Sequence, residues 1–579
     1  MPAENKDKLV VYQVFTRLFG NQNTTNKFYG TIEENGSGKF NDITDVALKA
    51  LKEFGISHVW YTGIIEHATL TDYSSYGISN DHPLIVKGIA GSPYAVKDYY
   101  DVDPDLAVDV AQRMQEFEAL IARTHNENLK AIIDFIPNHV ARQYNSDARP
   151  AGVRDFGEDD DVSVGFAPAN NFYYIPDHDF VVPEGHKSPI PTVAPYFERP
   201  AKATGNDVFR AQPSQYDWYE TIKLNYGIDY LNSGVTHFDP IPSTWTKMYD
   251  ILAYWTGKGV DGFRCDMAEM VPVAFWGWVI PMIQKINPEI IFIAEIYNPY
   301  LYHSYVKEGK FTYLYDKVGL YNSLRKLIEG HGTAEEITRL WQQESGDISD
   351  NMLRFLENHD EQRIASPFFA GDPWKAVPEI TLSATMQRGP FMIYFGQEVG
   401  VSAALGEGFQ GDDGRTTIFD YWGVTEIQGW INEGKFDGAG LTENQKQLRQ
   451  FYERLNHFIT TNEAVFAGEF YDLQYVNDNG QSPNYDKSRL YSYMRYTADQ
   501  QLLFIYNFDR ESGFHTSVSV PEGLWNHTLQ LGEPEQYVLK PVFPLLEPVA
   551  TQEATGIFST GIPLYLPPVS VFVFEIVSK

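Results

Sequence analysis

Short apolar segments, separated by stretches of helical periodicity, recur along most of the chain. Eight of them lie at 9–15, 56–64, 129–136, 260–266, 289–296, 311–316, 351–357 and 389–396. Between several of them, as in 43–55 and 110–130, apolar residues recur every three or four positions, which is typical of amphipathic helices. Strands that alternate with helices predict a closed parallel barrel, the α/β fold known as the (β/α)8 TIM barrel.

Two regions depart from this alternation, and each predicts a separate domain. Residues 140–235 are rich in Pro, Asn, Asp and Tyr and are too long for a structureless loop, so we expect an inserted domain after the third strand. From residue 466 the helical period disappears and β-rich segments alternate with turns, which predicts a C-terminal antiparallel β-sandwich over 466–579. The barrel would then comprise residues 1–139 and 236–465.

The overall charge narrows the choice of partners. The chain has 45 basic and 77 acidic residues, a net charge of -32, which disfavours nucleic acid and anionic membrane surfaces. No apolar run approaches the roughly 18–20 residues of a membrane helix. The N-terminus lacks the apolar core of a signal peptide, so we leave the compartment open between export with a leader removed and the cytoplasm. The single cysteine, Cys265, excludes internal disulfides and thiolate metal sites.

Polar residues follow four of the predicted strands at the point where each strand ends. Catalytic groups of a parallel barrel gather at this end of its strands. Several carboxylates on one rim are costly to hold together, because like charges raise one another's pKa, so we interpret this rim as an active site. These residues are Asp134, Asn138, His139, Arg264, Asp266, Glu295, Asn358, His359 and Asp360.

Four segments carry a resemblance to a known family. "DFIPNHV" (134–140), "GFRCD" (262–266), "AEIYN" (294–298) and "FLENHD" (355–360) resemble, in order, the four conserved regions of the α-amylase family of glycoside hydrolases, family 13. The segment "SPYAVKDYYDVDP" (92–104) resembles the family's loop after the second strand. The resemblance covers almost the whole chain and implies a barrel with an inserted domain B and a C-terminal sandwich.

The resemblance also implies roles for single residues. Asp266 would be the nucleophile, Glu295 the general acid and base, and Asp360 the carboxylate that stabilises the transition state. A retaining glycosidase needs its two catalytic carboxyl groups about 5–5.5 Å apart, and neighbouring strands lie about 4.7–4.9 Å apart. Arg264 would keep Asp266 ionised, since a nearby cation lowers the pKa of a carboxyl group. The remaining substrate-binding residues implied are His139, His359, Tyr94 and Asn358.

Calcium is the one cofactor that the resemblance brings in, and the chemistry itself requires none. Asn138 matches a family position that often binds calcium, and the alternative is a structural hydrogen bond to the neighbouring loop. In "GNQNTTN", Asn21, Asn23 and Asn26 are spaced like a calcium loop of some cyclodextrin-degrading relatives. Three amides without a carboxylate would bind calcium weakly, so a plain turn is the preferred interpretation there.

Three hypotheses on function follow from the motifs. The first is a retaining hydrolase of α-1,4-glucosidic bonds in starch-like α-glucans or maltooligosaccharides, acting through a covalent glycosyl-enzyme. The second is a transglycosylase on the same scaffold, similar to glucanotransferases or maltosyltransferases. The third is a non-catalytic relative, but such relatives have lost catalytic carboxylates that this chain retains. Glu269 and Met270 replace the Lys-His pair common in endo-amylases, which predicts a preference for short or unusually shaped glucans.

Overall fold

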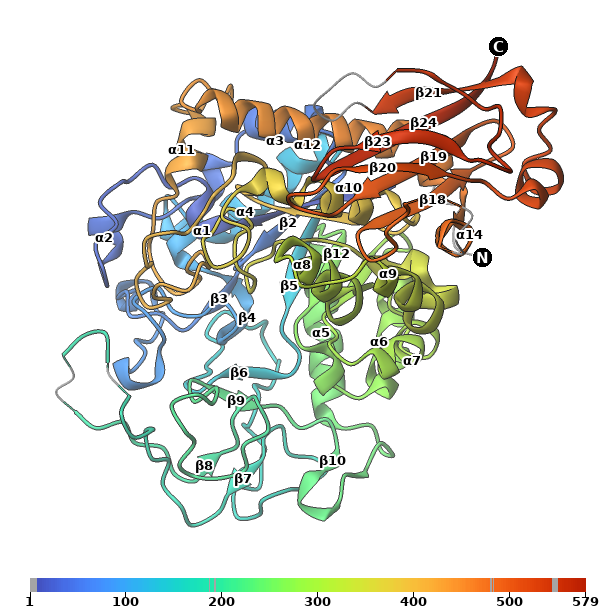
Figure 1. The fold of residues 1–579 in the computed structure, drawn as a ribbon. Coiled ribbons are helices and arrows are strands. Elements are labelled where there is room, and N and C mark those ends of the chain that lie inside the picture. Colours follow the sequence, from blue (N-terminus) through green and yellow to red (C-terminus); the bar gives the residue numbers. More distant parts are fainter. Residues whose placement is uncertain (1–7, 187, 192–193, 479–481, 483, 544–549) are drawn as a thin grey trace.

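A parallel barrel forms the centre of the computed structural model, which describes residues 8–186, 188–191, 194–478, 482, 484–543 and 550–579 (Figure 1). Each of the eight predicted apolar segments contains one of its strands, so the predicted barrel is confirmed. The strands are β1 (Val10–Phe15), β2 (His58–Thr62), β5 (Lys130–Phe135), β12 (Gly262–Cys265), β13 (Ile291–Ala294), β14 (Tyr313–Tyr315), β15 (Met352–Leu353) and β16 (Phe391–Tyr394).

The strands pair in chain order around the barrel, and β1 lies between β2 and β16. The last seam, between β15 and β16, closes through a parallel bridge that joins Arg354 and Phe391. Two backbone bonds hold it: Arg354 N donates to the carbonyl of Pro390 at 3.0 Å, and Met392 N donates to the carbonyl of Arg354 at 2.9 Å. The barrel strands are buried on both faces, which explains why the sequence shows them as continuous apolar runs.

Helices surround the barrel, as the periodicity predicted. The predicted helices at 43–55 and 110–130 contain α3 (Asp45–Glu53) and α4 (Arg113–Asn126), both shorter than the periodic pattern. The other main helices are α5 (Ser243–Gly257), α6 (Val273–Ile286), α7 (Tyr302–Lys307), α8 (Asn322–Ile328), α10 (Val377–Thr385) and α12 (Glu443–Thr461). Within the described residues, none of the helices has the length and apolar character needed to span a bilayer.

The long segment after β5 contains only short strands in its described residues. β6 (His139–Ala141) follows β5 directly and pairs antiparallel with β9 (Thr221–Lys223). The other pairs are β7 (Tyr174–Ile175) with β8 (Ala201–Lys202), and β10 (Ile228–Asp229) with β11 (Val235–Thr236). Figure 1 places these strands together at the end of the barrel opposite the C-terminal sheets. A separate hairpin, β3 (Ile65–His67) with β4 (Val96–Val102), lies in the loop after β2.

Two antiparallel sheets make up the C-terminal region, and the predicted sandwich is confirmed. One contains β17 (Glu469–Asp472), β18 (Leu490–Tyr496), β19 (Gln501–Asn507), β24 (Ser570–Ser578), β21 (Tyr537–Phe543) and β22 (Gln552–Glu553), and the other pairs β20 (Phe514–Val518) with β23 (Ile562–Leu566). Side chains from both sheets share one apolar core. The larger sheet rests on α10, where Arg495 Nη1 donates to the carbonyl of Thr385 at 3.1 Å.

Candidate active site

A single guanidinium joins two of the three carboxylates that the sequence predicted to be catalytic. Arg264 lies on β12, Asp266 comes just after this strand, and Glu295 comes just after the neighbouring strand β13. Arg264 Nη1 lies 2.8 Å from Asp266 Oδ1, and Nη2 lies 2.8 Å from Glu295 Oε1. The parallel register of the two strands therefore brings both carboxylates to one cation.

A fourth charged group completes this arrangement. Asp134, at the end of β5, has Oδ1 3.4 Å from Arg264 Nη1 and accepts a hydrogen bond of 2.9 Å from Trp60 Nε1. Arg264 is fully buried, and its guanidinium lies 5.3–5.5 Å from the ring centres of Trp60, Tyr94 and Tyr315. Cation–π attraction to three rings helps to offset the loss of hydration. We call Asp134, Asp266 and Glu295 around Arg264 the catalytic cluster.

The environment of Asp266 in this cluster raises its pKa. Burial is the largest cause, the negative charge of Glu295 adds to it, and Arg264 acts in the opposite direction. The sequence predicted only the contribution of Arg264. Burial also raises the pKa of Asp134 to about 6. One guanidinium therefore compensates three carboxylates incompletely in the ligand-free protein, and this favours protonation of the cluster as pH falls.

His139 reaches the cluster in a fixed tautomer. Lys223 Nζ donates to Asn138 Oδ1 at 2.5 Å, which orients the Asn138 amide so that its nitrogen faces His139 Nδ1 at 3.1 Å. An amide nitrogen can only donate, so Nδ1 accepts and the proton of the neutral ring lies on Nε2. Burial lowers the pKa of His139 to about 3, which keeps the ring neutral. Nε2 lies 4.0 Å from Asp266 Oδ2 and is available as a donor.

His359 is oriented in a similar way from the opposite side of the barrel. Gln13 Nε2, on β1, lies 2.8 Å from His359 Nδ1, which assigns the ring proton to Nε2. Nε2 lies 2.5 Å from the hydroxyl of Tyr94, and this hydroxyl in turn donates to Asp134 Oδ1 at 3.4 Å. The rings of Tyr94 and His359 are stacked, with centroids 5.1 Å apart. Tyr94, predicted to bind substrate, thus belongs to the same network as the catalytic cluster.

Asp360 is the most open of the three predicted catalytic carboxylates. Its side chain is 40% exposed, and its Oδ2 lies 3.1 Å from His359 Nε2. Asn358, predicted to bind substrate, is buried and its Oδ1 accepts the backbone N–H groups of Asp360 and Glu361 at 2.9 and 3.0 Å. The contacts of Asn358 in the structure therefore position the loop that carries Asp360.

The carboxylate of Glu295 has two further donors. Met267 N donates to Oε2 and the hydroxyl of Tyr297 donates to Oε1, both at 2.7 Å. Glu269 holds the backbone of Tyr297 in place, because its Oε2 accepts the backbone N–H groups of Tyr297 and Asn298 at 3.1 and 2.9 Å. Glu269 thus fixes the loop after β13 rather than lying free in solvent.

The residues around Asn138 do not fit a calcium ion. The amide oxygen that would bind the metal accepts its hydrogen bond from the ammonium of Lys223, which also forms an ion pair of 2.7 Å with Asp207 Oδ1 and lies 3.4 Å from the carbonyl of Met270. A buried ammonium therefore stands where the family resemblance placed a divalent cation.

The second predicted calcium loop is already held by hydrogen bonds. The amide oxygens of Asn21, Asn23 and Asn26 accept backbone N–H groups of Asn23, Thr25 and Gly423 at 2.7–3.1 Å. Each side-chain nitrogen donates to a backbone carbonyl. These bonds are those of a structural loop, and calcium there stays a prediction.

Several residues of this site were not predicted from the sequence to act there. Gln13, Trp60 and Tyr315 lie on barrel strands, and Lys223 lies on β9 of the insert. A polar or amphipathic side chain inside an otherwise apolar strand was the available signal. It did not identify partners, because Gln13 and His359 are separated by 346 residues.

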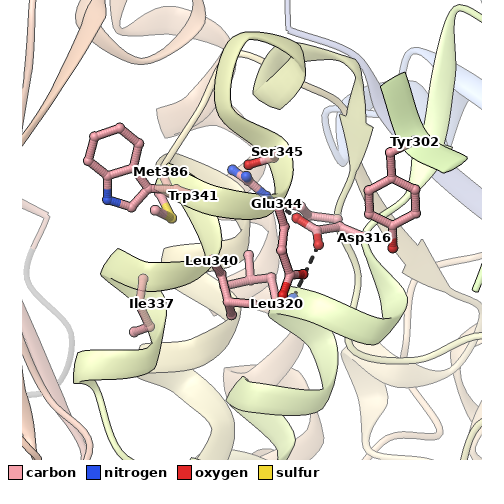
Figure 2. A pocket seen from close by; sticks show the side chains of 10 residues that line it. Tyr302, Asp316, Leu320, Ile337, Leu340, Trp341, Glu344, Ser345 and Met386 are labelled. Carbon is pink, nitrogen blue, oxygen red and sulfur yellow. Dashed lines mark hydrogen bonds and ion pairs between the residues drawn. The ribbon is translucent and has the colours of Figure 1, made fainter. Parts of the chain in front are cut away.

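Two hollows near the barrel differ in their fitness for a sugar. A cleft of about 340 Å³ is lined by loops that follow Asp266 and Glu295, including Glu269, Met270 and Asn298, and by Ile228 and Tyr230 of the insert. By contrast, an enclosed cavity of about 10 Å³ beside Asp316 and Glu344 holds at most one water molecule (Figure 2). Of these two, only the cleft has room for a sugar, and it lies beside the loops that follow Asp266 and Glu295.

Comparison with known proteins agrees with the motifs. The family model described as alpha amylase, catalytic domain, matches residues 13–416. The chain is 24% identical over 450 residues to alpha-amylase 3 of Dictyoglomus thermophilum, which covers 74% of this chain and 77% of that protein. It is 23% identical to a cyclomaltodextrin glucanotransferase of Bacillus sp. over 67% of this chain, but spans only 49% of that relative.

A similar fold is known from solved structures. The crystal structure of a maltogenic alpha-amylase from Thermotoga neapolitana superimposes with a TM-score of 0.60 at 20% identity and covers 99% of both chains. At this identity the likeness establishes the fold alone.

Proposed function

Because this chain belongs to the α-amylase family of glycoside hydrolases, we propose that it is a retaining hydrolase of α-1,4-glucosidic bonds in short α-glucans. The observation that supports this most is the shared contact of Asp266 and Glu295 with the two terminal nitrogens of Arg264. A retaining mechanism needs two carboxyl groups side by side, one as nucleophile and one as proton donor. Neighbouring strand ends supply that arrangement.

In the proposed first step, Asp266 attacks the anomeric carbon and Glu295 gives a proton to the departing glycosidic oxygen. The resulting glycosyl ester on Asp266 is then cleaved by water, which Glu295 deprotonates. The hydroxyl of Tyr297 donates to Glu295 Oε1, so it holds this carboxyl group in place during both proton transfers. His139, His359 and Asp360 would donate to or accept from the hydroxyl groups of the sugar that is attacked.

A second candidate is transfer of the glycosyl group to another sugar. The cleft beside Glu269 and Met270 is lined in part by apolar side chains, among them Val271 and Leu301. An acceptor sugar that fills this cleft would exclude water from the ester on Asp266, and the reaction would then lengthen glucans. Both candidates share the covalent step, so the occupant of the cleft decides between them.

The test is product analysis from maltotriose, maltoheptaose, cyclodextrin and starch. From a linear substrate, hydrolysis gives only shorter products, and from cyclodextrin it gives linear products no longer than the ring. Transfer gives longer products, and NMR of fresh products should show the α-anomer. Asp266→Asn should reduce kcat at least about 10⁴-fold, since an amide is a very poor nucleophile. Fresh β-anomeric products, or an Asp266→Asn enzyme within tenfold of wild type, would refute the proposed mechanism.

A further inference from the structure

A second group of carboxylates lies in the loop after β2, outside the catalytic cluster. It consists of Glu66 on β3, Asp101 on β4 and Asp147 in the first part of the insert. One oxygen from each of the three lies within 4.8 Å of the other two. We call these three residues the hairpin cluster.

Glu66 is the unusual member of the hairpin cluster. Its side chain is 1% exposed, and within the described part of the chain neither of its oxygens has a hydrogen-bond partner. Burial, followed by the charges of Asp98, Asp101 and Asp147, raises the pKa of Glu66 to about 9. Burying a carboxylate without a partner costs several kcal/mol, and a carboxylic acid would also need hydrogen bonds that are not present here.

The neighbouring cations are engaged elsewhere. Lys97 Nζ bonds the carbonyl of Ser79 and lies 2.9 Å from Asp81 Oδ2. Arg113 Nε donates to Asp101 Oδ2 at 2.9 Å, so it compensates Asp101 but not Glu66. No described cation therefore balances the charge that Glu66 carries when it is ionised.

The chain around Asp147 is held in place. The buried carboxylate of Asp98 accepts the hydroxyl of Ser146 at 2.5 Å and the backbone N–H of Ala148 at 2.8 Å. These two bonds fix the residues on both sides of Asp147, whose own side chain is exposed. The cluster thus has two buried carboxylates and a third, open to solvent, on a positioned segment.

We propose that the hairpin cluster binds a calcium ion through Glu66, Asp101 and Asp147. Calcium takes six to eight oxygen ligands at about 2.3–2.6 Å, so two oxygens on one ion lie at most about 5 Å apart, as they do here. Exposure at Asp147 leaves room for the water ligands that calcium accepts. Zinc is disfavoured because the cluster has neither His nor Cys, and magnesium because it demands a strict octahedron.

A bound ion would join the β3–β4 hairpin to the start of the insert. Tyr94 lies two residues before β4, so the same hairpin presents a residue of the active site. The inference does not depend on the proposed function, because it predicts a stabilising site rather than a step of the reaction. It also differs from the positions of Asn138 and Asn21, which the family resemblance suggested.

The test uses the full chain, stripped with EDTA and then titrated with calcium chloride or magnesium chloride alone. We expect calcium to raise Tm and to give a saturable isotherm by calorimetry, with a much weaker response to magnesium, because an ion that binds only the folded state stabilises it. Glu66→Gln should abolish the calcium response, yet its Tm without calcium should equal or exceed that of wild type, because Gln cannot ionise in this buried position.

Two further variants keep the test decisive. Asp147→Asn, at an exposed position, should fold normally and bind calcium at least about tenfold more weakly, since ligand charge sets affinity. Glu53→Gln, which alters an exposed carboxylate on α3, is the matched control and should respond as wild type does. The proposal would be overturned if calcium left the Tm of wild type unchanged. It would also be overturned if Glu66→Gln and Asp147→Asn both responded to calcium as strongly as wild type does.

Discussion

The catalytic cluster and the hairpin cluster both gather buried carboxylates at the C-terminal end of the barrel strands, but they differ in how the charge is compensated. In the catalytic cluster, Arg264 contacts three carboxylates at 2.8–3.4 Å and is enclosed by aromatic rings. In the hairpin cluster, Glu66 has neither a cation nor a hydrogen bond among the described residues. A built-in cation allows carboxylates to remain close together for catalysis, whereas an uncompensated group indicates a site for an ion.

The contact of Lys223 with Asn138 is a third case between these two. Here the sequence left calcium and a structural hydrogen bond as alternatives, and the structure has a hydrogen bond from the ammonium of Lys223. The same type of position can therefore be served by a side chain or by an ion. The residues around it, rather than the motif, decide which.

Removing Arg264 should have the largest effect on stability, because it would make the catalytic cluster resemble the hairpin cluster. Arg264→Gln leaves Asp134, Asp266 and Glu295 without a cation, which should lower the free energy of unfolding at pH 7 by about 3–5 kcal/mol. We expect kcat to fall on the order of 10³-fold. Denaturant unfolding and initial rates on maltotriose measure the two effects.

The loss of stability in Arg264→Gln should depend on pH. Asp266 has a higher pKa in the folded state than in the unfolded state, where it is near 4. Its ionisation therefore lowers stability as pH rises from the unfolded pKa through the folded pKa, and protonation at low pH removes this loss. The destabilisation should therefore be smaller at pH 5 than at pH 8. Arg495→Gln, at a buried arginine on β18 whose hydrogen bonds all go to backbone carbonyls, is the control and should show no such trend. Equal losses at both pH values would contradict this account of the charges.

Lys223→Met tests whether the ammonium of Lys223 takes the place of a metal ion beside Asn138. It leaves Asn138 Oδ1 unsatisfied, which costs about 1–3 kcal/mol, and releases the amide that fixes the tautomer of His139. Misplacing His139 should lower kcat/KM by about 10- to 100-fold. Lys202→Met, at another lysine of the insert, should leave kcat/KM unchanged. Wild-type kinetics of Lys223→Met would show that the contact with Asn138 is not needed.

The sequence predicted the strands, and the convergence of the candidate catalytic residues at their ends, better than it predicted the charges. Barrel strands are buried on both faces and appear in the sequence as apolar runs. The polar residues at their ends can therefore be identified from the sequence. The partners of these residues are not, since Lys223 is 85 residues from Asn138 and Glu66 has no motif. The pKa of Asp266 was expected to follow its neighbour Arg264, but burial, which only the fold reveals, has the larger effect.

The pH profile of the wild-type enzyme should reflect the incomplete compensation in the catalytic cluster. Protonation of Asp266 removes the proposed nucleophile, so below the acid-side pKa the value of kcat/KM should fall about tenfold for each pH unit. Because burial raises the pKa of Asp266, this acid-side pKa should lie clearly above 3.8, the ordinary value for aspartate. The apparent pKa belongs to the coupled cluster as a whole. An acid-side pKa of kcat/KM near 4, measured with an aryl glycoside, would indicate that Arg264 compensates the charge of Asp266 well.

Glu269 should give the smallest effect, because it acts on the catalytic cluster only through the loop that carries Tyr297. Glu269→Gln keeps an oxygen that can accept the N–H groups of Tyr297 and Asn298, so kcat/KM should change by less than about threefold. Glu269→Lys removes both bonds and should weaken the support that Tyr297 gives to Glu295.

Glu269→Lys also separates positioning from contact with the sugar. If Glu269 acts through Tyr297, cleavage of maltoheptaose, which needs a proton from Glu295, should slow by about tenfold, while an activated aryl glycoside, whose leaving group needs little protonation, should be affected less. The bonds cut in maltoheptaose should stay the same. If instead the variant cuts at different bonds with an unchanged kcat, Glu269 contacts the departing sugar, and the cleft of about 340 Å³ beside it is the place where chain length is selected.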